Sequence, residues 1–457
     1  MDPMPLPNDS NGFLVALASR ERKVLELKEE LQKAEDDLKK VKKQWAHHDE
    51  VVAQQDPCQR CQAINFEDLF SLTIQSSGIN GCWIAPLDIR ENYPGCGLCQ
   101  LLRSISPRLG TSIAGSKKRH HLRAFSASSR ERLLPPSSIA LGIYDGSPKN
   151  AYGGVKRSRS MARGVIRSVR SSNGSPEFQL AELINEENAD FDRMKTWLSV
   201  CKSLHSQSCQ VDDVIRPSGL KLIDCVTKRI VTAKPEDGYF ALSYVWGAAK
   251  KSSPCWSSHG GGIILPGTVS RVIEDTIMVV RSLNGRYLWV DQFCIDQENS
   301  QERHIKISNM DKIYEGAIAT IVAASGDGAN SGLPGVSCRR LRQPRFKVGN
   351  MVLASTLPQV SFPLTASTWA TRAWTYQEAV ISRRCLFFTD YQVYFSCIAM
   401  DCCESLSLPI HKSKVQLERA REKFVPIFSI LTRSQARQTG LASGNSLTAS
   451  NNTKVVR

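Results

Sequence analysis

The fold of this chain is decided by the stretch that runs from YFALSYVWG (239–247) to RYLWVDQFCIDQ (286–297). Each end of the stretch is a short apolar run, rich in aromatic residues, Val and Leu, that stops on polar groups. Such runs predict strands that are buried on both faces. Between them, LPGTVSRVIEDTIMVVRSL (265–283) repeats apolar residues at helical spacing. Strand, helix and strand form a βαβ unit, so the sequence predicts an α/β fold with a parallel sheet flanked by helices.

The flanking sequence extends this pattern in both directions. We expect the following elements: a helix over 191–209, a two-stranded hairpin over 219–233, a helix over 301–316, a buried strand over 317–324 and two strands within 385–397. These elements lie on both sides of the βαβ unit and enlarge the predicted sheet.

Length and composition exclude some classes of protein. A chain of 457 residues exceeds one ordinary hydrophobic core, so two or three folded units are predicted. No apolar run reaches the ~18 residues of a membrane span, and the N-terminus lacks the features of a signal peptide. Its 15 cysteines, without a secretion signal, indicate reduced thiols or metal ligands rather than disulfides. We therefore expect a cytoplasmic protein, with the nucleus as an open alternative.

The two ends of the chain are polar, and a heptad pattern follows the first of them. Residues 1–12 and 435–457 have compositions that predict disorder. Within 13–50, apolar residues spaced by three and four run from Leu17 to Trp45 amid Lys and Glu. This pattern predicts a coiled coil through which copies of the chain associate. The alternative is a solitary charged helix that packs against its own domain.

Residues 51–102 form a cysteine-rich segment. Each CxxC turn brings two thiolates to one side, so two such turns can complete the tetrahedral sphere of a Zn²⁺ ion. The predicted ligands are Cys58, Cys61, Cys96 and Cys99. Four protein ligands leave no open position, so this zinc would be structural. The long gap between the pairs leaves Cys82 as a spare ligand, and buried reduced thiols are the alternative.

Residues 103–190 form a basic linker, rich in Ser and Arg, with short strands predicted at 121–127 and 138–145. Of the net charge of +15, most comes from residues 101–170, which hold 15 basic and two acidic residues. The stretch 156–170 is a candidate for binding nucleic acid or another anionic surface. Aromatic residues for base stacking are scarce, so we favour a solvated loop and expect no nucleic-acid partner.

Polar residues follow the predicted strands at the edge where open α/β sheets bind ligands. Asp291 and Asp296 can contact a ribose hydroxyl or a metal, or act as a base. Alternatively, they cap the next helix and pair with Arg303 or Arg372. The candidate ligand-binding residues at this edge are Ser243, Trp246, Gly247, Asp296 and Gln297.

A second set of metal-ligating residues lies on the predicted helix over 191–209. Cys201, His205 and Cys209 step by four, so they share one side if the helix persists. The alternative is packing residues followed by a histidine that the helix dipole favours near the C-terminus.

An ordered series of motifs resembles the heterokaryon incompatibility (HET) domain of fungi. The motifs are WLSVCKSLHSQSC (197–209), LID (222–224), YFALSYVWG (239–247), YLWVDQFCIDQ (287–297), MDKIYEGAIATIVAASG (310–326), GLPG (332–335) and WATRAWTYQE (369–378). On this resemblance the domain spans 191–434. The cysteine pairs ahead of it also resemble an N-terminal region common in such proteins.

The resemblance implies a fungal protein that acts in non-self recognition and regulated cell death through an unidentified protein partner. It further implies a TIR-like sheet, because HET domains are thought to be distantly similar to TIR domains. The expected mechanism is signalling by clustering through the coiled coil.

The alternative is an NAD-consuming or related nucleotide hydrolase. In TIR domains that hydrolyse NAD⁺, a glutamate follows a tryptophan in a short motif, and Trp374 and Glu378 resemble that pair. The resemblance makes Glu378 and Asp291 the candidate catalytic residues. Alternatively, Glu378 is a helix-start glutamate held by Arg372, or by Arg383 and Arg384.

Overall fold

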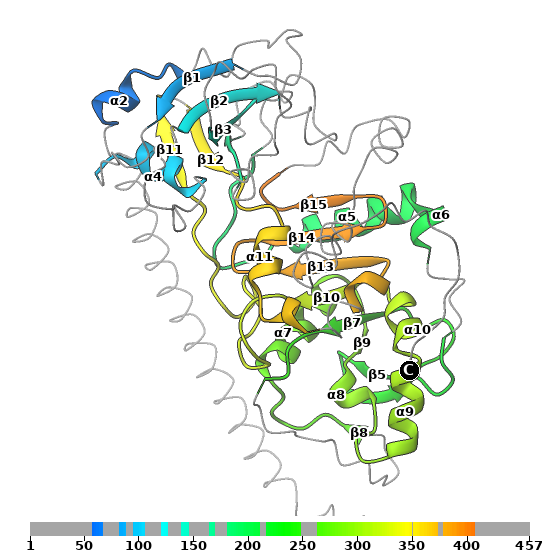
Figure 1. The fold of residues 1–457 in the computed structure, drawn as a ribbon. Coiled ribbons are helices and arrows are strands. Elements are labelled where there is room, and N and C mark those ends of the chain that lie inside the picture. Colours follow the sequence, from blue (N-terminus) through cyan, green and yellow to red (C-terminus); the bar gives the residue numbers. More distant parts are fainter. Residues whose placement is uncertain are drawn as a thin grey trace, which may run out of the picture.

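The computed structural model describes residues 57–66, 82–87, 95–105, 120–126, 139–145, 164–169, 181–210, 216–247, 263–349, 351–372 and 378–406. Figure 1 shows two sheets, one above the other, with helices beside both. The predicted coiled coil over 13–50, both predicted disordered ends and Trp374 lie outside the described residues. In the described part of the chain, no helix has the length and apolarity needed to cross a membrane.

The upper sheet has six strands in the order β1-β2-β3-β4-β12-β11, and its pairings are antiparallel. Its elements are β1 (Cys82–Leu87), β2 (His120–Ser126), β3 (Ile139–Asp145), β4 (Ile166–Ser168), β11 (Arg345–Val348) and β12 (Met351–Ser355), with helices α2 (Gln59–Gln62) and α4 (Gly97–Ser104). β2 and β3 are the two strands expected within the basic segment. One apolar cluster joins α4 to β2, β3, β11 and β12.

The lower sheet has nine strands in the order β15-β14-β13-β10-β7-β9-β5-β6-β8. The strands are β5 (Lys221–Asp224), β6 (Arg229–Thr232), β7 (Tyr239–Ser243), β8 (Ile263–Ile264), β9 (Tyr287–Trp289), β10 (Thr320–Ala323), β13 (Arg384–Phe388), β14 (Val393–Cys397) and β15 (Asp401–Cys403).

Four central strands of the lower sheet are parallel, which confirms the predicted α/β class. β7 pairs with β9 and with β10, and β10 pairs with β13. In chain order these strands lie 2-1-3-4, so the topology switches direction between β7 and β10. In doubly wound sheets, ligands bind beyond the carboxyl ends of strands at such a point.

Helices accompany the lower sheet on both faces. They are α5 (Phe191–Leu204), α6 (Ser206–Cys209), α7 (Arg271–Ser282), α8 (Asp291–Cys294), α9 (Ser300–Ser308), α10 (Met310–Glu315), α11 (Ser361–Ala366) and the 3₁₀ turn η5 (Trp369–Thr371). Because side chains alternate along a strand, β13 serves two cores. Leu386 and Phe388 join the main core, whereas Cys385 and Phe387 join a second cluster with α11.

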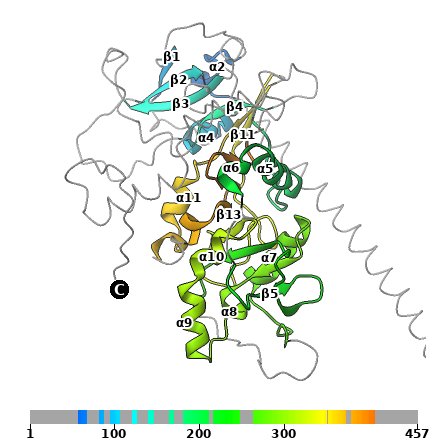
Figure 2. The same ribbon diagram turned by 90° about the vertical axis from the view of Figure 1, so that its right-hand side faces the viewer.

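The predicted elements are present, with two interruptions. The βαβ unit is β7, α7 and β9, and the predicted hairpin is β5 paired with β6. The helix expected over 191–209 breaks at His205, and the helix expected over 301–316 breaks at Asn309. In Figures 1 and 2, α5 and α6 lie at the end of the lower sheet that faces the upper sheet.

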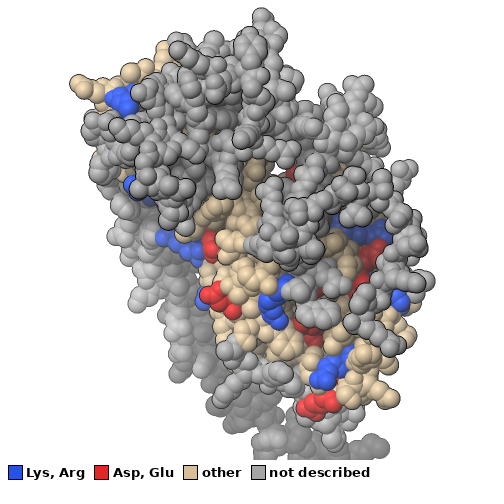
Figure 3. Space-filling model, viewed as in Figure 1, with Lys and Arg blue, Asp and Glu red and all other residues tan. Residues whose placement is uncertain are grey.

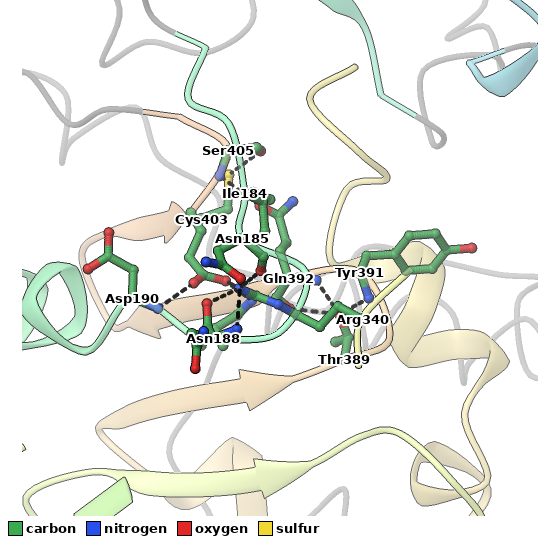
Figure 4. Close-up of polar contacts among 12 residues, drawn as sticks. Ile184, Asn185, Asn188, Asp190, Arg340, Thr389, Tyr391, Gln392, Cys403 and Ser405 are labelled. Atoms are coloured by element: carbon green, nitrogen blue, oxygen red, sulfur yellow. Dashed lines mark hydrogen bonds and ion pairs between the residues drawn. The ribbon is translucent and has the colours of Figure 1, made fainter. Parts of the chain in front are cut away.

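A buried ion pair fastens the segment before α5 to the edge of the lower sheet. Arg340 pairs with Glu404, and both side chains are almost fully buried. The same guanidinium donates to the carbonyl oxygens of Asn185 and Asn188, as Figure 4 shows. Glu404 also accepts from the backbone N–H of Asp190 at 2.8 Å. One arginine and one glutamate therefore join three parts of the chain that are distant in sequence.

Candidate functional site

Three predicted site residues gather at the carboxyl ends of the central strands. Ser243 is the last residue of β7, and Asp291 is the first residue of α8, directly after β9. Glu378 belongs to the short helical segment that precedes β13 and is 8% exposed. The charge of Asp291 and the hydroxyl of Ser243 both act on the pKa of Glu378. The structure thus brings together residues that lie up to 135 positions apart in the sequence.

Asp291 is held by groups from two neighbouring strand ends. The indole Nε1 of Trp246 donates to both carboxylate oxygens, at 3.0 and 3.2 Å. The backbone N–H of Gln292 donates to Oδ1 at 2.7 Å. Although the residue keeps some exposed surface, burial of its carboxylate raises the pKa of Asp291 to about 6. The donors and the nearby Arg372 act in the opposite direction and do not fully compensate.

Glu378 has a more strongly shifted pKa. Burial, together with the negative charge of Asp291, raises the pKa of Glu378 to about 8, although Ser243, Tyr314 and Arg372 act to lower it. The arginine that acts on this carboxyl is Arg372, one of the partners expected from the sequence. The other two expected partners bind elsewhere.

Arg383 and Arg384 are engaged away from Glu378. Arg383 pairs with Glu315 at 2.8 Å and donates to the carbonyl oxygen of Gln210. Arg384 donates through Nε to the sulfur of Cys201 at 3.1 Å. The alternative in which Arg383 and Arg384 hold Glu378 therefore has no support from their contacts.

Two carboxyls with separated pKa values can serve different chemical roles. Near neutral pH, Asp291 is the group that ionises, whereas Glu378 stays largely protonated. Such a pair can stabilise a developing positive charge with one carboxylate and donate a proton from the other. The cluster therefore has the composition of an acid–base site.

Three aromatic residues complete the cluster, and sequence reasoning did not single them out. Tyr244 donates to Oε1 of Gln292 at 2.9 Å, and Tyr314 donates to the carbonyl oxygen of Leu242 at 3.1 Å. Burial raises the pKa of both tyrosines, so they stay neutral. Trp369, fully buried, donates to Oγ of Ser243 at 2.9 Å. All three belong to the quoted motifs, which was the available signal.

The remaining predicted ligand-binding residues have local contacts. Asp296 accepts from the backbone N–H groups of Glu298 and Asn299 in the turn before α9, whereas the side chain of Asn299 caps that helix. Gln297 donates to the carbonyl oxygen of Asp291 at 3.0 Å. At Gly247 φ is +67°, and an added Cβ would lie 3.0 Å from the backbone of Gly328. The glycine therefore permits a close approach between two loops at the strand ends.

A hollow of about 640 Å³ lies at the ends of β10 and β13. Polar residues that line it include Ser325, Asp327, Thr368 and Asp390. Thr368 bonds with Asp327 and directly precedes Trp369. Ser243, Asp291 and Glu378 are not among the residues that line the hollow.

The four cysteines of the two CxxC pairs also meet. Their sulfur atoms all lie within 4.8 Å of one another, and this group can hold a metal ion. Cys99 lies 3.7 Å from Cys58 and 3.6 Å from Cys61, sulfur to sulfur. A tetrahedron with metal–sulfur bonds of ~2.3 Å has edges of about 3.8 Å, so the spacing fits. Cys82, the spare ligand expected from the sequence, lies in β1.

Charge is mixed on the described surface. On the face seen in Figure 3, described acidic and basic side chains are interspersed among uncharged ones. Most of the basic stretch over 156–170 lies outside the described residues.

Comparison with known proteins gives one family. Residues 239–378 match the family model "Heterokaryon incompatibility protein (HET)". A curated relative, "Heterokaryon incompatibility protein 6, OR allele" of Neurospora crassa, is 28% identical over 128 residues. That match covers 26% of this chain and 17% of the relative, well under two thirds of its length. No solved structure matches the chain significantly.

Proposed function

This chain is a HET-domain protein, with the domain matched over residues 239–378, and from that premise we propose that it acts in heterokaryon incompatibility and the cell death that follows non-self recognition in fungi. The observation that carries the proposal is the extent of the match. It begins with β7 and ends at Glu378, so it covers three of the four central parallel strands and the whole acidic cluster.

The proposed mode of action is signalling by clustering. Residues 13–50 associate copies of the chain, and the clustered domains engage a protein partner in the cytoplasm. The strand order 2-1-3-4 is that of an open α/β sheet. TIR domains are α/β modules of signalling, so this order supports a TIR-like arrangement. In the upper unit, Cys58, Cys61, Cys96 and Cys99 hold a structural Zn²⁺ ion.

Deletion of residues 13–50 tests the clustering step. Expressed in a fungal host, the full chain should kill and run as an oligomer, whereas the deletion variant should be monomeric and harmless. Deletion of 1–12 is the matched control and should change neither property. A fully oligomeric and lethal chain without 13–50 would exclude this role for the segment.

The second candidate function is hydrolysis of NAD⁺ or a related nucleotide, and the acidic cluster is the observation that favours it. Cleavage of the nicotinamide–ribose bond develops positive charge on the sugar, which the ionised Asp291 would stabilise. Glu378 would contact the ribose hydroxyls, and Trp374, which lies outside the described residues, stays a predicted ligand-binding residue. The hollow at the ends of β10 and β13 has space for part of the nucleotide.

Measurement of NAD⁺ in host cells separates the two candidates. The hydrolase predicts that Glu378→Gln abolishes both NAD⁺ loss and death, while Glu274→Gln, at an exposed ion pair with Lys228 on α7, abolishes neither. If cells die with NAD⁺ intact, the hydrolase is excluded and signalling through protein contacts is retained.

A further inference from the structure

We infer that Cys201, His205, Cys209 and Cys397 bind a second structural zinc ion, inside the lower unit. The four ligand atoms all lie within 4.8 Å of one another, and all four residues are buried. This group is separate from the CxxC cluster in the upper unit. Its three thiolates and one imidazole form a ligand set typical of structural zinc.

The spacing of the ligand atoms fits a tetrahedral zinc ion. The sulfur of Cys397 lies 3.5 Å from Nδ1 of His205. Zinc bonds of ~2.3 Å to sulfur and ~2.0–2.1 Å to nitrogen give a tetrahedral edge of about 3.6 Å. The three cysteines are free thiols with 0% exposure, and His205 is 4% exposed. The site is therefore closed to solvent and has no open position for a substrate.

The backbone explains how residues from two elements meet. α5 ends at Leu204, and His205 has φ −118° and ψ 24°, which breaks the helix before α6 begins at Ser206. In an unbroken helix, Cys201 and Cys209 would lie ~12 Å apart along the axis, so the break allows their sulfur atoms to lie within 4.8 Å of each other. Cys397 is the last residue of β14 and lies 192 positions from His205.

Hydrogen-bond donors and charge around the site match zinc thiolates. The guanidinium of Arg384 donates to the sulfur of Cys201 at 3.1 Å, and the N–H of Met400 donates to that of Cys397 at 3.2 Å. Outer contacts of this kind hold metal ligands in place. Three thiolates and one Zn²⁺ carry a net charge of −1, which buried Arg384 neutralises.

The zinc ion would connect α5 and α6 to the end of β14. Arg384, on β13, also donates to the carbonyl oxygen of Ile318, just before β10. The site therefore links the N-terminal helices of the lower unit to three neighbouring strands. Its role is structural and is independent of the proposed activity.

Zinc analysis of the purified full chain tests this inference. If both four-ligand clusters bind zinc, inductively coupled plasma mass spectrometry should find two zinc ions per chain. Cys397→Ser should retain one, and Cys58→Ser with Cys96→Ser should also retain one. Cys225→Ser, at a buried cysteine outside both clusters, should retain two.

A conservative ligand exchange covers the case in which Cys397→Ser fails to fold. His205→Cys should keep two metal ions, and its Co²⁺-substituted form should gain thiolate-to-cobalt charge-transfer absorption relative to wild type. Two results would overturn the inference. One is the loss of all zinc when Cys58→Ser and Cys96→Ser are combined in the otherwise wild-type chain. The other is a His205→Cys variant that has the same zinc content and the same Co²⁺ absorption spectrum as wild type.

Discussion

Glu378 and Asp291 show how one buried cluster gives two carboxyls different properties. Trp246 and a backbone N–H stabilise the charged form of Asp291, whose pKa is about 6. Glu378 is more deeply buried and faces the charge of Asp291, so its pKa is about 8. Between these values one carboxyl is ionised and the other is protonated.

If the cluster hydrolyses NAD⁺ through an ionised Asp291 and a protonated Glu378, the rate should depend on pH in a bell shape. We expect activity to rise near pH 6 and fall near pH 8, because the two titrations belong to one coupled pair. Initial rates of nicotinamide release from pH 5 to 9 measure this. A rate that still rises between pH 8 and pH 9 would exclude a protonated Glu378 as the acting form.

The pKa of Glu378 also makes stability dependent on pH. Its pKa is raised from the model-peptide value of 4.5 to about 8, so the folded state holds a proton that the unfolded chain releases. Stability from this group is complete below pH 4.5 and declines as pH rises towards 8. Glu378→Gln should remove that decline, a difference on the order of 5 kcal/mol.

Urea unfolding between pH 5 and pH 9 measures this effect. Glu274→Gln serves as the control because its carboxylate forms an exposed ion pair with Lys228. The control should follow the wild-type pH dependence. Parallel curves for wild type and Glu378→Gln would show that this carboxyl does not titrate as described.

Arg340 and Arg339 are adjacent arginines with different environments. Arg340 pairs with Glu404 where both side chains are buried, whereas Arg339 pairs with Glu186 at the surface. Arg340→Met should leave Glu404 buried without its partner and cost about 3–5 kcal/mol. Arg339→Met should cost less than ~1 kcal/mol. If chemical denaturation shows equal losses in the free energy of unfolding for the two variants, the Arg340–Glu404 pair does not hold the segment before α5 to the sheet.

At the scale of elements, the loop after β10 is held against α7. Asp275, buried on α7, accepts from the N–H of Leu333 at 2.6 Å and from Oγ of Ser337 at 2.5 Å. A carboxylate therefore fixes the loop, and the loop borders the hollow at the strand ends.

Gly332 is required by the shape of this loop. Its φ is +76°, and an added Cβ would lie 2.6 Å from Oγ of Ser337 and 3.0 Å from Oδ2 of Asp275. Gly332→Ala should therefore destabilise the protein by about 1–3 kcal/mol. Gly267→Ala, where no atom lies within 4 Å of the added Cβ, should be near neutral. Thermal unfolding of the two variants provides the comparison.

At the scale of the whole molecule, one hairpin links the two sheets. β11 and β12 follow β10 in the chain, yet they complete the upper sheet, where β12 pairs with β4. Leu353 of β12 is fully buried in the upper core. The core of the upper sheet is therefore formed both by the N-terminal strands and by β11 and β12, which lie within the HET match.

A fragment that begins at residue 181 should be aggregation-prone. It would expose the β12 edge and the apolar side chains of Phe346 and Leu353, and unpaired apolar edges promote association. A fragment that begins at residue 51 keeps β4 and should remain monodisperse by size-exclusion chromatography. If both fragments behave alike, the shared hairpin is dispensable for solubility.

Local pattern was sufficient for much of this molecule. Alternation and helical spacing over 239–297 predicted the βαβ unit and the parallel sheet, because burial on a strand or helix follows its own period. The two CxxC pairs predicted a four-cysteine cluster from turn geometry alone, and the motifs identified the family. The expected limits of the domain, 191–434, stay a prediction.

The tertiary structure decided what depends on contacts between distant residues. Nothing in the spacing of Cys201, His205 and Cys209 indicates that Cys397 is the fourth member of their group. Likewise, Asp291 and Glu378 influence each other only because the fold brings the turn after β9 and the helical segment before β13 together near Ser243, at the end of β7. Periodicity describes which face of an element is buried, whereas strand order and chain crossings determine which buried faces meet.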